Sequence, residues 1–379
     1  MPHARKCEHI KVYPPHPTAA VQRRPLRETA PTVPYKHAHF AIVRFMDSQS
    51  EKIGFVLMNT GTPDSPDPRD IKPYLIEFLS DPNLIHMPRA LWLPILHLFI
   101  ANKRPEKTAP RYEKIWTPEG SPFILDSRLQ AQGINQRFQE AGINAIAKLG
   151  MRYGNPSLDT ALNGLEAAGC RKIIAFPLFP QTAFCTVGSC KGKIKQVMRR
   201  HKNLQLAGVI EGYNHNPLYH EALTASIREA WEYQPGSKLM FSFHSIPLSD
   251  VKAGDTYVEQ IKSDLQKVTE LLGIPENDWS MAFHSRFEDP HAWVTPHPRA
   301  KLSEWAEEGV TRVGILTPGF AADCLESLYD IKDVTCEYFR SLCKQHGREA
   351  DITYIPALNH REDHLDLLFE VAKQAIEEF

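Results

Sequence analysis

Residues 238–247, KLMFSFHSIP, contain the pattern that decides the fold. The first seven residues are almost continuously apolar, and they end at His244 before a turn of Ser, Ile and Pro. A run of this kind suits a parallel strand covered by helices on both faces, because a half-exposed strand would alternate apolar and polar residues. We therefore expect a buried strand whose carboxyl end lies at His244.

Seven further runs have the same character, and segments with helical spacing separate them. One such segment, 158–169, carries leucines at helical intervals and ends on a glycine, a common residue after a helix C-terminus. The alternation of strand and helix predicts an α/β fold with doubly wound parallel sheets. The other runs are IGFVLMN (53–59), AIAKLGMRY (145–153), KIIAFPL (172–178), LQLAGVIEG (204–212), WSMAFHS (279–285), TRVGILTP (311–318) and ITYIPAL (352–358).

The number of strands also predicts a division into domains. Eight short strands fit two small sheets better than one large sheet, because the mean sheet has about five or six strands. We expect a first domain over 50–190 and a second over 191–379, with the last helix packing back on the first domain.

The first 49 residues differ from the rest of the chain. They hold seven of the 30 prolines, they are rich in Lys and Arg, and they sustain neither a helical nor a strand period. Such a segment buries too little apolar area to offset the entropy of ordering it. We predict a disordered extension over 1–49, with Met46 as a plausible true start. An organelle transit segment is the alternative.

The composition excludes several classes of protein. The formal net charge is -1, so no global charge attracts nucleic acid. No run of 18 uninterrupted apolar residues occurs, and no glycine-rich nucleotide-binding motif is present. The seven cysteines form no C-x-x-C pair, which favours reduced thiols in the cytoplasm over a disulfide framework. The same spacing matches no clear iron–sulfur signature, so we expect no such cluster.

His244 is the strongest single candidate for chemistry. Ligands of open parallel sheets bind beyond the carboxyl ends of the strands, where His244 is expected to lie. A neutral imidazole accepts a proton near neutral pH and also binds transition metals. A strand-end histidine that only hydrogen-bonds a loop remains the alternative interpretation.

A row of acids follows another predicted strand. Glu326, Asp330 and Asp333 are spaced i, i+4, i+7, which places them on one face of an α-helix. Like charges at this spacing destabilise a helix, so a row that conducts protons or iron is one explanation. A solvated acidic face, or a capping box formed by Asp323 and Glu326, is the other.

The most apolar segment in the chain is LWLPILHLFI, residues 91–100. It includes Trp92 and Leu93, and Lys103 and Arg104 follow it. The segment is too short to span a bilayer. One interpretation is an ordinary buried helix, and the other is an exposed lip that meets an apolar ligand or a membrane surface.

Several motifs in the same order resemble the ferrochelatase family. The similarity covers roughly Gly54 to the end of the chain, and the combination of motifs is far more specific than any one of them. The motifs are FVLMNTGTPDSP (55–66), FLSDPNL (78–84), YEKIW…GSPF (112–123), MRYGNPS (151–157), PLFPQ…TVGS (177–189), FSFHSIP (241–247), FHSRF…W (283–293) and PGFAADCLESL (318–328).

The resemblance implies two Rossmann-like domains with a porphyrin in the cleft between them. It implies insertion of Fe²⁺, a substrate, into protoporphyrin IX to give haem, by a monomer in the cytoplasm that contacts the inner membrane through 89–104. His244 and Glu326 then serve as catalytic residues and metal ligands. The resemblance assigns porphyrin contacts to Thr60, Arg104, Tyr112, Ser121 and Trp293. The lip interpretation adds Trp92 and Leu93 as porphyrin contacts, and the spacing of the acidic row adds Asp330 and Asp333 as a proton or iron path.

Two rival functions share parts of this pattern. A chelatase for cobalt or for a coproporphyrin would use the same His244 and Glu326. A non-catalytic two-domain protein that closes on a small ligand would need neither a proton acceptor nor an acidic row.

Overall fold

A computed structural model describes residues 51–285 and 292–379. The predicted extension over 1–49 lies outside these residues. Across the described ranges, no helix combines the length and the apolar character needed to cross a membrane.

The first part of the fold is a four-stranded parallel sheet with the strand order β2-β1-β3-β4. Its elements are β1 (Ile53–Asn59), α1 (Pro68–Leu79), α2 (Arg89–Ile95), the π-helix η1 (Leu96–Ile100), α3 (Ala101–Ile115), α4 (Pro122–Glu140), β2 (Ala145–Met151), α5 (Leu158–Ala167), β3 (Lys172–Pro177), the π-helix η2 (Phe184–Gly188), α6 (Ser189–Met198) and β4 (Gln205–Val209).

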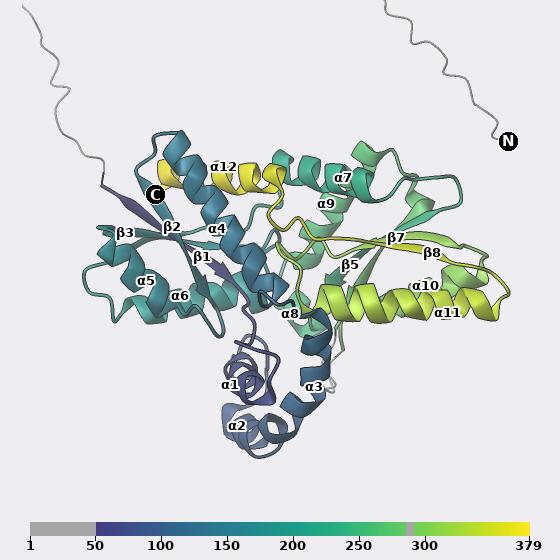
Figure 1. Cartoon of the computed structure of the whole chain (residues 1–379), viewed down its shortest axis with the longest axis horizontal. Helices are drawn as coiled ribbons and strands as arrows, with labels where there is room; N and C mark the ends of the chain where they lie inside the picture. The colour runs from purple at the N-terminus through teal and green to yellow at the C-terminus, as the bar shows by residue number, and fades with distance from the viewer. Residues whose placement is uncertain (1–50, 286–291) are drawn as a thin grey trace, which may run out of the picture. The chain divides into compact units, whose positions relative to one another are not determined.

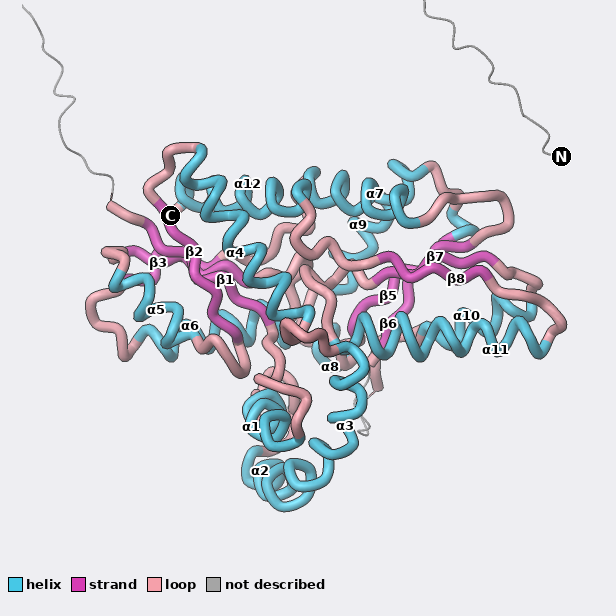
Figure 2. Tube along the Cα trace, viewed as in Figure 1, coloured by secondary structure: helices cyan, strands magenta, loops and turns pink. Residues whose placement is uncertain are grey.

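The second part is another four-stranded parallel sheet with the order β6-β5-β7-β8. Figure 2 shows its strands as a group separate from those of the first sheet. Its elements are α7 (Pro217–Ala230), β5 (Lys238–His244), α8 (Leu248–Lys252), α9 (Tyr257–Leu272), the 3₁₀ turn η3 (Glu276–Asp278), β6 (Trp279–His284), α10 (Pro298–Glu307), β7 (Arg312–Leu316), the π-helix η4 (Glu326–Thr335), α11 (Cys336–Gln345), β8 (Asp351–Ile355) and α12 (Glu362–Glu378).

All eight predicted strands form, and the predicted fold class is confirmed. The boundary predicted at residue 190 is misplaced, because β4 lies beyond it and yet pairs with β3 at the edge of the first sheet. The composition between Met198 and Gln205 gave no sign of this, since strand pairing depends on hydrogen-bond partners far along the chain.

The strands bury different side chains on their two faces. In β1, Phe55 and Leu57 belong to one apolar cluster, whereas Val56 and Met58 belong to another. This division follows from the two-residue period of a strand, and it explains why the run is apolar throughout. The cluster that contains Phe55 also contains Phe241 and Phe243 of β5, so the inner faces of both sheets share one core.

Helices α4 and α12 lie against each other over this common core (Figure 1). Arg137 of α4 forms ion pairs with Glu362 and Asp366 of α12, both at 2.7 Å. At the contact, a Cβ atom added to Gly133 would lie 2.5 Å from the Leu365 side chain. The two helices therefore approach closely only because residue 133 has no side chain.

Replacing Gly133 by Ala should lower the free energy of unfolding by about 1–3 kcal/mol, although alanine favours helices, because the added methyl group overpacks the α4–α12 contact. Urea unfolding followed by circular dichroism measures the change. Gly192 of α6 is the matched control, since it is exposed and nothing lies within 4 Å of an added Cβ atom. Gly192→Ala should be neutral or stabilising, and equal effects of the two substitutions would contradict this account.

Candidate functional site

A cavity of about 520 Å³ lies at the carboxyl ends of strands from both sheets. Among its lining residues, Thr60 follows β1, Phe179 follows β3, His244 ends β5 and His284 ends β6. The volume falls within the roughly 300–1,000 Å³ of sites that hold small molecules. The expectation that the strand ends form a ligand site therefore agrees with the arrangement of the chain.

The turn after β1 depends on a glycine. Gly61 has a φ of 108°, and a Cβ atom at this position would lie 1.8 Å from the carbonyl oxygen of Tyr153. The Tyr74 hydroxyl donates a hydrogen bond to the carbonyl oxygen of Gly61 at 3.2 Å. This close approach holds Thr60 and Thr62 at the cavity wall.

His244 is half-buried, and its hydrogen bond determines which ring nitrogen is free. Nδ1 lies 2.7 Å from the carbonyl oxygen of Ser245. Because a carbonyl oxygen only accepts hydrogen bonds, Nδ1 carries the proton of the neutral ring, and Nε2 keeps its lone pair. The ring is thus suited to accept a proton or to bind a metal through Nε2.

The chain segment 292–296 crosses the ends of β5 and β6. The Val294 N–H group donates to the carbonyl oxygen of Ile246 at 3.0 Å, and the Ser245 hydroxyl donates to the carbonyl oxygen of Val294 at 3.0 Å. Trp293 forms a bridge with Pro247 and lines the cavity. These bonds fix the backbone that carries Trp293 beside His244.

Glu326 begins η4, and this helix corrects the predicted acidic row. In a π-helix each N–H bonds five residues back, so side chains on one face recur every four to five residues rather than every three to four. Glu326, Asp330 and Val334 accordingly line the cavity. Asp333 is exposed and is absent from the cavity lining, so its predicted place in the row is wrong.

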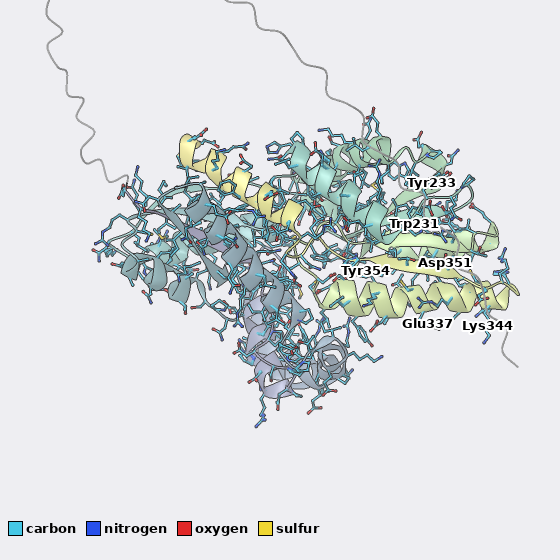
Figure 3. The ribbon with its side chains drawn as sticks, turned by 45° about the horizontal axis from the view of Figure 1, so that its top comes forward. Trp231, Tyr233, Glu337, Lys344, Asp351 and Tyr354 are labelled. Atoms are coloured by element: carbon cyan, nitrogen blue, oxygen red, sulfur yellow. The ribbon has the colours of Figure 1, made fainter. Side chains whose placement is uncertain are left out.

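The capping alternative for Glu326 does not match the bonds at the start of η4, where no side chain caps the helix. Asp323 instead anchors the preceding loop. Its carboxylate accepts from the Ser327 hydroxyl at 2.8 Å, from the Tyr354 hydroxyl at 2.5 Å and from the Asn359 side-chain amide at 2.9 Å. Figure 3 shows Tyr354, which lies on β8. Three donors therefore hold the loop that presents Glu326 to the cavity.

Glu326 has protonated groups around it. Burial, together with the Glu326 carboxylate, raises the pKa of Tyr74 and of the Cys324 thiol. Burial also raises the pKa of Tyr112, with Tyr74 and Glu326 adding to the effect. All three groups line the cavity and keep their protons at neutral pH.

Asp330 joins η4 to helix α3 across the cavity. It pairs with Arg111, whose guanidinium also lies 5.0 Å from the centre of the Tyr329 ring. Burial raises the pKa of Asp330, and Arg111 opposes this rise. The pair spans 219 residues of sequence, and no local pattern indicated it.

The cavity lining includes Thr60, Arg104, Tyr112 and Trp293 among the predicted porphyrin contacts. Three other predicted contacts lie elsewhere among the described residues. Trp92 is buried and donates from Nε1 to the carbonyl oxygen of Leu79 at 2.7 Å, and Leu93 packs against the same apolar cluster. Ser121 is buried one layer behind Thr62, from whose hydroxyl it accepts a hydrogen bond at 3.3 Å.

The segment 89–104 has both of the features that its sequence left open, a buried side and an exposed apolar side. Trp92 and Leu96 face inward, as a buried helix requires. Leu91, Ile95, Leu98 and Phe99 form an exposed apolar face, which we call the lip face, and they are 62%, 38%, 65% and 60% exposed. Figure 1 shows α1, α2 and α3 grouped below the level of the two sheets in this view.

The described cysteines lie in three places. Cys170 is buried in the outer apolar cluster of the first sheet, and Cys324 shares the cavity with two others. Cys185 and Cys190 line the cavity, whereas Cys336 and Cys343 are buried in the apolar cluster that packs α10 and α11 against the second sheet. Among residues 51–285 and 292–379, no three side chains of His, Cys, Asp or Glu gather as a metal site. A metal at His244 and Glu326 would therefore depend on further ligands supplied by the bound substrate or by water.

His284 is a cavity residue that the sequence argument missed. It is fully buried at the end of β6, beside His244, with the two ring centres 5.8 Å apart. Burial lowers the pKa of His284 well below its usual range, and the nearby His244 and His297 add to this effect. The sequence offered two signals, its place near the end of the predicted strand 279–285 and its position in the FHSRF…W motif, and the structure adds its pairing with His244.

The family model and the relatives found by sequence agree on one family. The Ferrochelatase family model matches residues 52–376. The chain is 37% identical to a ferrochelatase from Thioalkalivibrio sulfidiphilus over 86% of this chain and 88% of that protein, and 38% identical to one from Bordetella pertussis over 81% and 84%. The structure of SirB from Bacillus subtilis with Fe³⁺ has a similar fold, with a TM-score of 0.50 and 11% identity over 86% of this chain and 98% of that one.

Tyr354→Phe should lower the free energy of unfolding by about 2 kcal/mol, because it removes a buried donor to the Asp323 carboxylate. Thermal unfolding of the purified protein measures the loss. Tyr329→Phe is the matched control, since it keeps the ring that contacts Arg111 and removes only a hydroxyl. If both variants melt at the wild-type temperature, Tyr354 does not anchor the loop before Glu326.

Proposed function

Because this chain belongs to the ferrochelatase family, we propose that it inserts ferrous iron into protoporphyrin IX and releases two protons, the step that forms haem. One observation carries the proposal. A single cavity at the ends of two parallel sheets contains both a histidine with an unprotonated Nε2 and the carboxylate of Glu326.

The reaction requires a base inside the cavity. A free porphyrin has two pyrrole N–H groups, and both protons must leave as Fe²⁺ enters, so that the macrocycle ends with the same net charge. Nε2 of His244 accepts the first proton, because its lone pair faces no competing donor among the described residues. The Ser245 carbonyl oxygen then stabilises the imidazolium through Nδ1.

Iron enters as a substrate and needs ligands that suit it on the way. Imidazole and carboxylate groups both bind ferrous iron, so Glu326 holds it next to the macrocycle, with Nε2 of His244 as a second ligand until that nitrogen takes the proton. Asp330 continues the route along η4. Its raised pKa allows it to carry a proton, whereas Arg111 competes with any cation for the carboxylate. We assign to Asp330 the passage of protons outward rather than tight binding of iron.

The remaining lining residues suit a flat aromatic ligand with acidic groups. Trp293 and Tyr112 offer aromatic surface, and Thr60 lies at the end of β1. Arg104 lies on α3 at the edge of the cavity, where a guanidinium pairs with a carboxylate such as a propionate. Binding energy at these contacts is available to hold a distorted macrocycle near His244.

We also assign a membrane surface to the lip face. Four apolar side chains cluster in one short stretch, and the exposed Lys103 and Lys107 follow it on α3. This pairing of apolar and cationic groups suits the headgroup region of an anionic bilayer. In this proposal the monomer works in the cytoplasm and takes an apolar substrate from the inner membrane.

Glu326→Gln should lower the rate of iron insertion about 10²–10⁴-fold with little change in stability, since the amide neither accepts a proton nor binds iron well. His244→Ala should have an effect of similar size, and Asp330→Asn a smaller one. Anaerobic assays with protoporphyrin IX and Fe²⁺ measure the rates, and parallel assays with coproporphyrin or Co²⁺ test the rival chelatases.

Asp333→Asn is the matched control for these variants, because Asp333 lies on the same π-helix but outside the cavity. It should retain wild-type turnover. If the Asp333 and Glu326 variants lost equal amounts of turnover, the rate would depend on the charge of the helix rather than on chemistry in the cavity. Full turnover in both Glu326→Gln and His244→Ala would overturn the proposed mechanism.

Replacing Leu98 and Phe99 together by Ser should reduce binding to phosphatidylglycerol vesicles about tenfold or more, because both side chains are largely exposed on the lip face. Vesicle co-sedimentation measures the binding. Leu271→Ser removes an exposed leucine from α9 and should leave binding unchanged. If the double variant is less stable but still binds vesicles like the wild type, the lip face stabilises the fold rather than contacting the membrane.

A further inference from the structure

His284 has a hydrogen-bonding state that its surroundings determine. Its Nδ1 lies 2.8 Å from the hydroxyl oxygen of Ser242, which is fully buried on β5. Among the described residues, the Ser242 hydroxyl has no other hydrogen-bond partner. If Nδ1 carried the proton, the hydroxyl proton would have no acceptor in a buried place, at considerable cost. The hydroxyl therefore donates to Nδ1, and the proton of the neutral ring lies on Nε2.

This Nε2–H group has no acceptor within the described part of the chain. Its ring packs between His244 and Phe320, with ring centres 5.8 Å and 5.7 Å away, and all three side chains line the cavity. Ser285, the next residue, has a φ of 53°, a strained backbone conformation for serine. A buried donor without a partner and a strained backbone are both costly features that recur at functional sites.

The two histidines that line this cavity therefore carry opposite groups on Nε2. His244 offers a lone pair, and His284 offers a proton. A proton directed outward from a ring nitrogen repels a metal cation, so His284 is unsuited to bind Fe²⁺. It suits instead an acceptor atom of the organic substrate, and a porphyrin carries such atoms as the unprotonated ring nitrogens and the carboxylate oxygens.

We propose that His284 is a porphyrin-binding residue, whose Nε2–H group donates a hydrogen bond to an acceptor atom of the macrocycle while Ser242 holds the ring in the required tautomer. Nε2 itself is buried, and the His244 and Phe320 rings pack against the His284 ring, so a movement of side chains around Nε2 accompanies porphyrin entry. The inference rests on the proposed function, because it takes the cavity to be the porphyrin site.

The test compares porphyrin affinity in variants that keep or remove the donor. Quenching of tryptophan fluorescence by iron-free protoporphyrin IX gives the Kd. His284→Phe keeps a ring without a donor and should raise this Kd roughly tenfold. His284→Gln keeps a neutral donor and should stay within about twofold of wild type. Ser242→Ala removes the donor that keeps the His284 proton on Nε2, so it should give an intermediate Kd for protoporphyrin IX. The KM for Fe²⁺ should stay unchanged in all three variants.

Two results would overturn the inference. One is a wild-type Kd for protoporphyrin IX in His284→Phe, and the other is a raised KM for Fe²⁺ with an unchanged porphyrin Kd, which would assign His284 to the metal. If His284→Phe does not fold, the ¹⁵N resonances of the wild-type imidazole decide, since a proton on Nδ1 of His284 contradicts the assignment. A wild-type protein that binds no protoporphyrin IX would overturn the proposed function instead.

Discussion

The shared core between the two sheets is the constraint on which the rest of the structure depends. Phe55 and Leu57 on one sheet and Phe241 and Phe243 on the other belong to the same buried cluster. Each sheet is covered on its outer face by its own helices, and the cluster on the inner faces also includes side chains of α4, α7, α9 and α12. Burial of aromatic and aliphatic side chains supplies the main favourable free energy of folding, so this arrangement holds the strand ends of both sheets around one cavity.

Rigid strand ends allow side chains of opposite chemical character to meet. His244, Glu326 and His284 all line the cavity, although each comes from a different strand or from the helix that follows one. They bring a lone pair, a carboxylate and a buried N–H group to this place. Hydrogen bonds to Ser245 and Ser242 determine the tautomers of the two histidines. The polarity of the site is therefore determined before any substrate arrives, which is what electrostatic preorganisation requires.

The sequence predicted the strands and the strand-end residues, because short local patterns encode both. Continuous apolar runs identified all eight strands, and the strand-end rule brought His244 and Glu326 to the cavity. The wrong predictions arose where the local pattern was overruled by the structure around it. An α-helical period placed Asp333 beside Glu326, but η4 is a π-helix. Trp92 looked like a ligand contact, but its indole N–H bonds to the Leu79 carbonyl oxygen. The Arg111–Asp330 pair and the role of Ser242 depend on contacts between distant segments, which a single sequence does not reveal.

The π-helix also limits how the length of this chain can vary. Ten residues of η4 run directly into α11, and the Thr335 hydroxyl reaches back five residues to the carbonyl oxygen of Asp330. Loss of one residue here would favour ordinary α-helical bonding and would rotate everything beyond it by about 100°. The buried face of α11, with Cys336 and Phe339, would then turn away from the second sheet. A substitution along this helix changes one side chain, whereas a deletion would disturb the site and the core together.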